Sequence, residues 1–320
     1  MALTFEQTRA LFDLPPDVIY LDGNSLGPPP RAAAARVQEV MQKEWGGELI
    51  KAWNTAGWYT QPRRVGDRIA RLIGAETGSV IMGDTLSIKV YQALAAALGM
   101  RGDRRVILSD TGNFPSDLYM AQGLIRTLGL GHRLSLMEPE AVMDAISTDV
   151  AAVLITEVDY RTGRRHNMRE IIAKAHAQGA LVVWDLAHSA GAFPLDVAAD
   201  GADFAVGCSY KYLNGGPGAP AFIYVAPRHA DDAIPVLSGW MGHDRPFAFA
   251  AEYHAAGGIE RMRVGTPPVL ALAALEAALD IWDQVDMQAL RARSLELTTL
   301  FMDSVERACP LVRLVTPRED

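Results

Sequence analysis

A lysine follows a short apolar run near the middle of the chain. Residues 204–208 (Phe-Ala-Val-Gly-Cys) predict a strand, and residues 214–218 (Asn-Gly-Gly-Pro-Gly) predict a turn behind it. Lys211 lies between the two, so we expect it at a strand end, held by rigid neighbours. A single lysine is usually a solvated charge, and it needs a partner before chemistry can be assigned to it.

A second apolar run supplies a partner. Residues 181–184 (Leu-Val-Val-Trp) predict another strand, which is followed by Asp185 and, three residues later, His188. Ligands bind at the carboxyl ends of strands in open α/β sheets, so Asp185 and Lys211 are expected to face one site. Taken alone, Asp185 is as well suited to capping whatever follows the strand.

A lysine and a buried carboxylate have a chemical use together. A lysine amine forms an imine with an aldehyde cofactor, and pyridoxal phosphate draws electrons from its substrate while its ring nitrogen is protonated. A carboxylate beside that nitrogen keeps the proton in place. Lys211 and Asp185, with His188 nearby, therefore predict a pyridoxal-phosphate site.

Two strand-to-helix turns upstream are candidates to complete this site. Residues 84–87 (Asp-Thr-Leu-Ser) open a predicted helix, whose free amides could bind a phosphate together with the hydroxyl of Thr85 or Ser87. The same hydroxyls could instead cap the helix. Phe114, in the next such turn, could stack on a planar cofactor or close the core, and the residues alone favour the core.

The order of the predicted elements indicates the fold class. Apolar runs alternate with helical patterns of ten or more residues, which is typical of an α/β protein with a mostly parallel sheet and helices on both faces. The predicted strands are 80–83, 105–109, 151–156, 181–184, 204–208 and 221–225, and the predicted helices are 31–45, 62–73, 84–100, 118–128, 167–178 and two more that end near residue 307.

Composition excludes several classes of protein. The 320 residues are 49% hydrophobic and 21% charged, as in ordinary globular chains, and a net charge of −8 argues against nucleic-acid binding. Cys208 and Cys309 are too few for a disulfide framework or a zinc site and indicate a reducing compartment. The longest apolar stretch, 269–282, is interrupted by two acidic residues. We therefore expect a cytoplasmic protein without a metal, a membrane span or a signal peptide.

Three segments together resemble the kynureninase family. Residues 210–218 read Tyr-Lys-Tyr-Leu-Asn-Gly-Gly-Pro-Gly, residues 184–191 read Trp-Asp-Leu-Ala-His-Ser-Ala-Gly, and residues 113–117 read Asn-Phe-Pro-Ser-Asp. The resemblance extends from residue 20 to residue 319, which is essentially the whole chain. It implies a fold type I pyridoxal-phosphate enzyme, usually a homodimer, that hydrolyses L-kynurenine to anthranilate and L-alanine.

The resemblance also implies roles around the cofactor ring. Lys211 is implied to hold the cofactor and later to move protons at the substrate α-carbon. Asp185 is implied to pair with the ring nitrogen, with Asp117 supporting that side. His188 is implied to lie beside the ring, and Phe114 to cover its other face.

Further residues match positions at the cofactor phosphate and the substrate. The residues implied to bind or flank the phosphate are Leu86, Ser87, Thr156 and Tyr210. Tyr210 is also a candidate proton donor. Trp240 and Thr266 match positions that reach the phosphate across a dimer interface. Ser25 and Trp53 match positions in the substrate pocket.

The chain departs from the family pattern at two places. Lys89 stands where bacterial members more often have asparagine, and we interpret it as a surface residue of the helix after the phosphate loop. The chain also stops at Asp320, before most of a C-terminal small domain that carries an arginine for the substrate α-carboxylate. We therefore expect cofactor binding and dimerisation but poor turnover of kynurenine, with apolar surface exposed on the helices at 269–282 and 290–301.

The expected domains follow from the same resemblance. They are an N-terminal arm at 1–30, a large pyridoxal-phosphate domain at 31–285 and the incomplete beginning of a small domain at 286–320.

Two other functions remain compatible with these residues. A cysteine desulfurase would share Lys211, Asp185 and His188, but it needs a reactive cysteine on a mobile loop, and neither Cys208 in a strand run nor Cys309 at a helix end suits that role. The other is a cofactor-binding protein without catalysis, because a fold does not guarantee activity. Kynurenine and 3-hydroxykynurenine are both candidate substrates.

Overall fold

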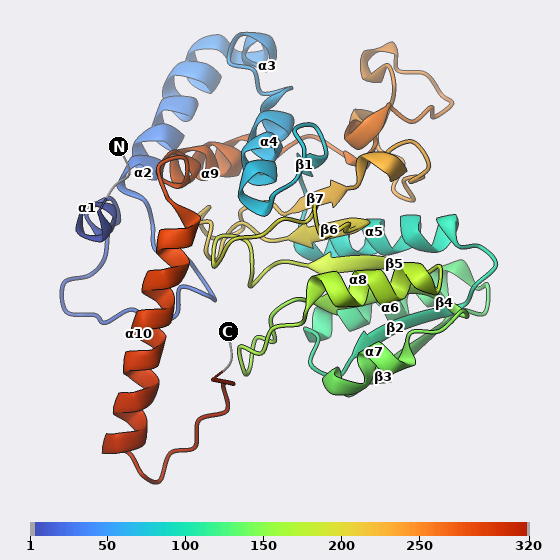
Figure 1. The fold of residues 1–320 in the computed structure, drawn as a ribbon. Coiled ribbons are helices and arrows are strands. Elements are labelled where there is room, and N and C mark those ends of the chain that lie inside the picture. Colours follow the sequence, from blue (N-terminus) through green and yellow to red (C-terminus); the bar gives the residue numbers. More distant parts are fainter. Residues whose placement is uncertain (1–3, 319–320) are drawn as a thin grey trace.

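The computed structural model describes residues 4–318 and is built on a seven-stranded sheet (Figure 1). The strands are β1 (Val80–Met82), β2 (Val106–Asp110), β3 (Arg133–Met137), β4 (Val150–Thr156), β5 (Leu181–Asp185), β6 (Phe204–Gly207) and β7 (Phe222–Val225). Their spatial order is β1-β7-β6-β5-β4-β2-β3. All pairs from β6 to β3 are parallel, and only β7 runs antiparallel to its two neighbours. The predicted mostly parallel sheet is confirmed.

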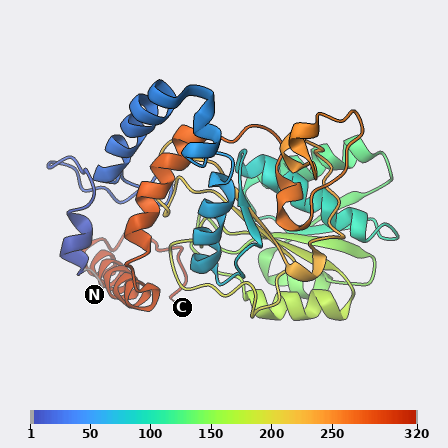
Figure 2. The ribbon, with the colours of Figure 1, turned by 90° about the horizontal axis from the view of Figure 1, so that it is seen from above.

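Helices cover both faces of the sheet (Figures 1 and 2). One face is covered by α5 (Leu86–Met100) and α6 (Pro115–Leu128), and the other by α4 (Gln61–Ile73), α8 (Met168–Ala177) and α9 (Val269–Trp282). Successive strand residues point to opposite faces, so in β5 Val182 and Trp184 join one core while Leu181 and Val183 join the other. Burial on both sides explains why the strands read as continuous apolar runs.

Local sequence fixes the ends of these helices. α4 ends at Gly74 and α6 at Gly129, which adopt the left-handed backbone (φ 67° and 61°) that favours glycine at this position. Pro115 opens α6, where its missing N–H costs nothing. The predicted ends of both helices were accurate because such signals lie within the segment itself. The start of α6 was predicted at Leu118, three residues late, because Pro115 was assigned to the preceding turn.

Other segments complete the chain. They are α1 (Phe5–Arg9), α2 (Arg31–Glu39), the π-helical η1 (Val40–Glu48), η2 (Leu49–Lys51), α3 (Ala52–Thr55), η3 (Pro139–Ala141), α7 (Val142–Ala145), η4 (Pro227–His229), η5 (Trp240–Gly242), η6 (Pro246–Ala248), η7 (Gly258–Met262) and α10 (Met287–Ala308). The helix predicted at 31–45 is α-helical only to Glu39 and continues in the wider η1, which includes two glycines of low helix propensity.

The last two long helices differ in burial. α9 packs against α2 and α4 and buries most of one side, so the apolar exposure expected at 269–282 is wrong. α10 extends away from the sheet, as Figure 1 shows, and none of its residues is buried. Leu297, Leu300 and Phe301 are 48%, 60% and 58% exposed, which confirms the expectation for 290–301.

Two points concern the chain as a whole. Residues 1–3 and 319–320, at the outer limits of the expected domains and of the resemblance, lie outside the described residues. Within residues 4–318, no helix has the length and apolar character needed to cross a membrane.

Candidate active site

The register of β4 and β5 places two of the predicted residues side by side. Thr156 and Asp185 end these strands and are paired in the sheet, with Thr156 Oγ1 3.4 Å from Asp185 Oδ2. Thr156 donates a shorter bond of 2.5 Å to Asn113 Oδ1 in the turn after β2. Asn113 is buried, and its amide donates to Ser109 Oγ and to the Leu154 carbonyl. Sequence analysis assigned no role to Asn113, although it orients Thr156.

Lys211 reaches the same edge from the loop after β6. Its Nζ lies 2.8 Å from His188 Nε2, and the residue is only 9% exposed. Burial, followed by the positive charge of Lys211, lowers the pKa of His188 to about 4. The imidazole is therefore neutral near pH 7, and its Nε2 accepts a hydrogen bond from the Lys211 amine. The predicted trio of Lys211, His188 and Asp185 lies at one site.

The N-terminal arm packs against the backbone of this lysine. Gly27 N donates to the Tyr210 carbonyl at 2.9 Å, and the Asn214 side chain donates to the Pro28 carbonyl at 3.2 Å. A Cβ on Gly27 would lie 2.2 Å from the Lys211 carbonyl oxygen, so the close approach requires glycine. The predicted pocket residue Ser25 is exposed two residues before this contact.

Two neighbouring carboxylates near Lys211 accept few hydrogen bonds. Asp185 and Asp117 are each 1% exposed, and Asp185 Oδ1 accepts from Ala187 N at 2.8 Å. Burial raises the pKa of Asp185 to about 6, against the opposing effects of that amide and of Lys211. Burial and then the charge of Asp185 raise the pKa of Asp117 well above its ordinary value. Among the described residues, Asp117 Oδ2 has no hydrogen-bond partner.

Two aromatic rings flank the amine. The rings of Phe114 and Tyr210 each have their centres 5.9 Å from Lys211 Nζ. Phe114 is 40% exposed and contacts Tyr160 edge-on at 5.2 Å, so the core position favoured from the residues alone is wrong. The turn after β2 presents the ring at the open edge of the sheet instead. Burial raises the pKa of Tyr210 to about 12, which keeps its phenol protonated near neutral pH.

The start of α5 is not capped by side chains. Its N-cap residue, Thr85, makes no side-chain hydrogen bond to the helix, and Ser87 Oγ instead lies 2.9 Å from Ser116 Oγ in α6. The alternative in which these hydroxyls only cap the helix is therefore wrong. First-turn amides, beginning at Leu86, are the groups that bind anions at helix starts.

Lys89 is not the surface residue that we expected. It is fully buried, and its Nζ lies 3.1 Å from Asp84 Oδ2, 2.9 Å from Gln92 Oε1 and 3.1 Å from the Met262 carbonyl. The helix pattern could not reveal this burial because Met262 comes from a segment far along the chain.

Three further predicted residues lie apart from Lys211. Trp240 is 41% exposed and packs edge-on against Phe247. Thr266 is exposed in the loop before α9. Trp53 packs edge-on against Trp58 at 5.9 Å. Within residues 4–318, no hydrogen bond or ring contact joins any of the three to Lys211.

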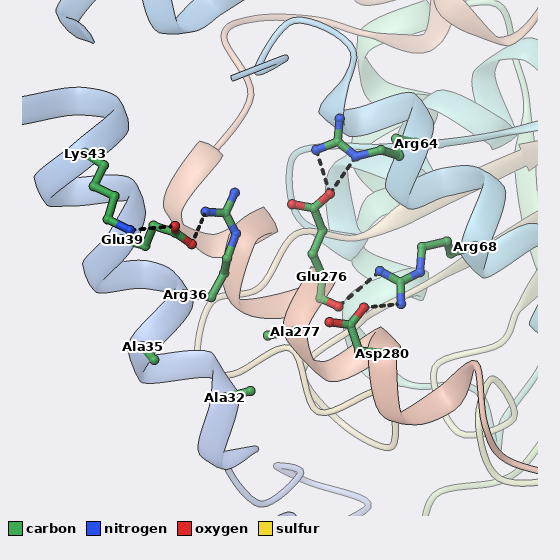
Figure 3. Close-up of a pocket in the computed structure, with 10 residues that line it drawn as sticks. All are labelled: Ala32, Ala35, Arg36, Glu39, Lys43, Arg64, Arg68, Glu276, Ala277 and Asp280. Carbon is green, nitrogen blue, oxygen red and sulfur yellow. Dashed lines mark hydrogen bonds and ion pairs between the residues drawn. The ribbon is translucent and has the colours of Figure 1, made fainter. Parts of the chain in front are cut away.

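A separate hollow lies away from Lys211, among α2, η1, α4 and α9 (Figure 3). It has a volume of about 660 Å³ and none of the predicted site residues lines it. Its arginines already have acidic partners, including Glu276 for Arg64 and Asp280 for Arg68. It is therefore a charged crevice between helices and not a continuation of the Lys211 site.

The fold and the family model define the class of protein. The aminotransferase class-V family model matches residues 19–320. An apo cysteine desulfurase structure from Thermococcus onnurineus NA1 superposes with a TM-score of 0.78 over 96% of this chain and 78% of that chain. Its identity of 22% makes this a likeness of fold alone. The chain has the fold type I architecture of class-V aminotransferase-like proteins.

Closer relatives narrow the class. A kynureninase from Deinococcus radiodurans is 54% identical over 317 residues, which cover 97% of this chain and 77% of the relative. A kynureninase from Pseudomonas fluorescens is 50% identical over 318 residues, which cover 97% and 76%. The chain belongs to the kynureninase family. Members of this family are enzymes that use pyridoxal phosphate.

Proposed function

We propose that this chain hydrolyses the Cβ–Cγ bond of L-kynurenine or 3-hydroxykynurenine, releasing anthranilate or 3-hydroxyanthranilate together with L-alanine. The structural observation that carries the proposal is the contact between Lys211 Nζ and His188 Nε2, 2.8 Å long, beside two buried carboxylates. The family relationship supplies the reaction.

The residues present fit the cofactor at three points. A protonated ring nitrogen is the cation that complements Asp185 and Asp117, whose pKa values are raised by burial. The buried Asp117 Oδ2 has no partner among the described residues. The uncapped start of α5 suits a phosphate, and the amine of Lys211 suits an aldehyde.

When bound, pyridoxal phosphate supplies the electron sink for bonds at the substrate α-carbon. Lys211 would hold the cofactor through its amine and would then carry a proton to and from that carbon. His188, neutral at pH 7, accepts a hydrogen bond from Lys211 and so holds the Lys211 amine in place. Asp185 would keep the ring nitrogen protonated, and Asn113 holds Thr156 beside the Asp185 carboxylate.

Tyr210 is suited to the cleavage step. The reaction consumes one water, whose hydroxyl bonds to the γ-carbon and becomes part of the carboxylate product, while a proton goes to Cβ to form alanine. A phenol that stays protonated near neutral pH can donate that proton. The ring of Tyr210 lies 5.9 Å from Lys211 Nζ, which puts both proton carriers at one site.

A homodimer in the cytoplasm is part of the proposal. Trp240, Phe247 and Phe249 are 41%, 60% and 79% exposed on neighbouring turns, and large apolar rings gathered at a surface favour a protein partner. In this arrangement Trp240 and Thr266 serve the cofactor phosphate of the second copy. Trp53 and Ser25 remain candidates for the substrate pocket. We also keep the domain boundaries after residues 30 and 285 as part of the proposal.

One assay separates this function from its rival. The reconstituted protein is given L-kynurenine, 3-hydroxykynurenine or L-cysteine, and the fluorescence of the anthranilate products is compared with sulfide release. We expect anthranilate products, even at a low turnover rate, and no sulfide, because burial raises the pKa of the Cys208 thiol to about 11 and leaves little thiolate. Sulfide without anthranilate would contradict the proposal. Competition between the two kynurenines identifies the preferred substrate.

A further inference from the structure

Lys89 is a buried cation that the proposed reaction does not use. Its three N–H donors meet three acceptors from three segments: Asp84 in the turn after β1, Gln92 one turn further along α5, and the Met262 carbonyl at the end of η7. Burial lowers the pKa of Lys89, and the Asp84 carboxylate opposes that effect. A fully buried lysine whose donors are all satisfied holds its partners in one arrangement.

The first partner controls the start of α5. Asp84 has a left-handed backbone (φ 56°), which is uncommon for a residue other than glycine. Ala221 fixes one side of this turn, since Gly83 N donates to the Ala221 carbonyl at 2.9 Å and Ala221 N donates to the Asp84 carbonyl at 3.0 Å. Lys89 fixes the Asp84 side chain. α5 begins two residues later at Leu86, so the turn sets the direction of its first amides.

The Met262 carbonyl, a second partner of Lys89, holds the loop at 262–266. Gln92 Nε2 adds a second bond to the Met262 carbonyl at 3.3 Å. Beyond Met262, the Val264 carbonyl accepts from Met241 N at 3.2 Å. A Cβ on Gly239 would lie 2.0 Å from the Val264 carbonyl oxygen, so the two chain segments are packed tightly.

The loops held in this way carry residues proposed for two cofactor phosphates, the α5 turn for the phosphate of the same copy and the loops of Trp240 and Thr266 for that of the second copy. Leu86 and Ser87 follow the Asp84 turn, Thr266 follows Met262, and Trp240 lies between Gly239 and Met241. Thr266 and Asp84 also line one small hollow. Lys89 is thus the common hydrogen-bond partner of the α5 turn and of the loop before Thr266.

We propose that Lys89 is a positioning residue for the cofactor phosphate, and that its ammonium fixes the first turn of α5 relative to the loop at 262–266. The inference rests on the proposed function, since it assumes that the start of α5 binds this phosphate. Without the ammonium, the Asp84 carboxylate and the Met262 carbonyl lose a buried donor, and the turn shifts to recover hydrogen bonds. Lys211 and Asp185 make no contact with Lys89 and keep their arrangement.

The test compares two ligands that differ only in the phosphate. The apoenzymes of the wild type and of Lys89→Met are titrated with pyridoxal phosphate and with pyridoxal, which has the aldehyde and the ring but no phosphate. We expect the preference for the phosphorylated ligand to fall about tenfold or more, equivalent to the loss of one charge-assisted contact, with pyridoxal binding nearly unchanged. Lys43→Met is the matched control, because the Lys43 side chain is 76% exposed.

A gentler variant covers the case in which Lys89→Met does not fold. Asp84→Asn keeps a residue that tolerates the left-handed backbone but removes the charge that faces Lys89. We expect a smaller loss of the same preference. The affinity of the variant for inorganic phosphate, measured by competition with pyridoxal phosphate, should fall by a similar factor. Asp103→Asn, at a side chain that is 80% exposed, is the control.

The outcomes separate the two proposals. If the folded variants keep the wild-type preference, or lose affinity equally for both ligands, Lys89 is not a positioning residue for the phosphate and the proposed function stands. If Lys89→Met does not fold, Asp84→Asn decides by the same criterion. A wild-type protein that does not bind pyridoxal phosphate contradicts the proposed function itself, and the inference with it.

Discussion

Two buried aspartates, at opposite ends of the neighbouring strands β5 and β6, have pKa values shifted in opposite directions. Asp203 precedes β6, while Asp185 ends the parallel strand β5, and each is 1% exposed. Burial acts to raise both pKa values. For Asp203, hydrogen bonds from His176, His229 and the Val182 amide outweigh burial and hold the pKa well below its ordinary range. For Asp185, burial prevails and the pKa rises to about 6.

The difference lies in the number of donors that each carboxylate receives. Asp203 accepts four hydrogen bonds of 2.7–2.9 Å, including one from Arg228, and is complete within the chain. Asp185 has one short bond, from Ala187 N, and a neighbouring carboxyl in Asp117. The two carboxylates are equally buried but accept different numbers of hydrogen bonds. This difference distinguishes a structural carboxylate from one that is suited to a cationic ligand. Four variants and conditions can break or sharpen this comparison.

The largest effect is expected at the single cation of the Asp185 site. Lys211→Ala should lower anthranilate production by about 10³-fold or more, because covalent attachment and proton transfer both depend on this amine. The visible absorbance of the cofactor bound as an imine should also be lost. Lys174→Ala, on the outer part of α8, is the control and should behave as wild type. Retained activity in Lys211→Ala would show that another group carries the chemistry.

The second effect concerns the incomplete carboxylate itself. Asp185→Asn should lower turnover on the order of 10²-fold, because a neutral amide no longer holds the ring nitrogen protonated. Cofactor affinity should fall much less, since the phosphate contacts at the start of α5 remain. Steady-state kinetics and a cofactor titration on the same preparation measure both quantities. Equal losses in the two would indicate that Asp185 is a structural residue like Asp203.

The third effect concerns Asp203, where we expect a loss of stability and not of turnover. Asp203→Asn should lower the free energy of unfolding by about 3 kcal/mol, because it removes the charge of a buried carboxylate that accepts hydrogen bonds from His176, His229 and Arg228. Turnover at a temperature where the variant is folded should stay close to wild type. Urea unfolding and anthranilate production test the two statements, with Asp103→Asn as the exposed control. A variant with normal stability would mean that these contacts contribute little.

The smallest effect is a difference in pH dependence. A carboxyl whose folded pKa is raised stabilises the protein fully below its unfolded pKa and loses that contribution as the pH rises through the folded value. For Asp185 in the apoprotein, stability is therefore lost between about pH 4 and pH 6. The contribution of Asp203 to stability changes with pH in the opposite direction. Because its folded pKa is lowered, the contribution is fully present above about pH 4 and is lost on acidification.

This prediction is measured by urea unfolding of the apoprotein at pH 4.5 and pH 7.5. Between these conditions, Asp185→Asn should gain stability relative to wild type, on the order of 2 kcal/mol. Asp203→Asn should follow the wild-type profile over the same interval, because Asp203 is ionised in both the folded and the unfolded state above about pH 4. A profile of Asp185→Asn parallel to that of wild type would contradict the raised pKa of Asp185.

Sequence alone predicted the parts of this molecule that depend on local signals. The strands that lead to Asp185 and to the loop of Lys211 are bounded apolar runs, and glycine or proline marks the ends of α4 and α6. The end of the sheet that holds the site was therefore predictable. The edge strand β3 was missed because its side chains are only partly buried and give no continuous apolar run.

Non-local contacts account for the rest. Lys89 has an ordinary helical context, and its burial depends on Met262, which is 173 residues away. The four donors to Asp203 come from α8, β5 and η4, which no spacing within one segment reveals. Phe114 has the composition of a core residue, and only the assembled sheet shows that its turn faces the amine of Lys211.

The central claim is that the incompletely satisfied carboxylates mark the cofactor site and that Lys211 is its covalent anchor. Borohydride reduction of the reconstituted protein, followed by peptide mass mapping, locates the attached pyridoxyl group directly. The account predicts one labelled position, Lys211, in the wild type and also in Asp185→Asn. A label on Lys89, Lys174 or any other lysine, with Lys211 unmodified, would contradict it.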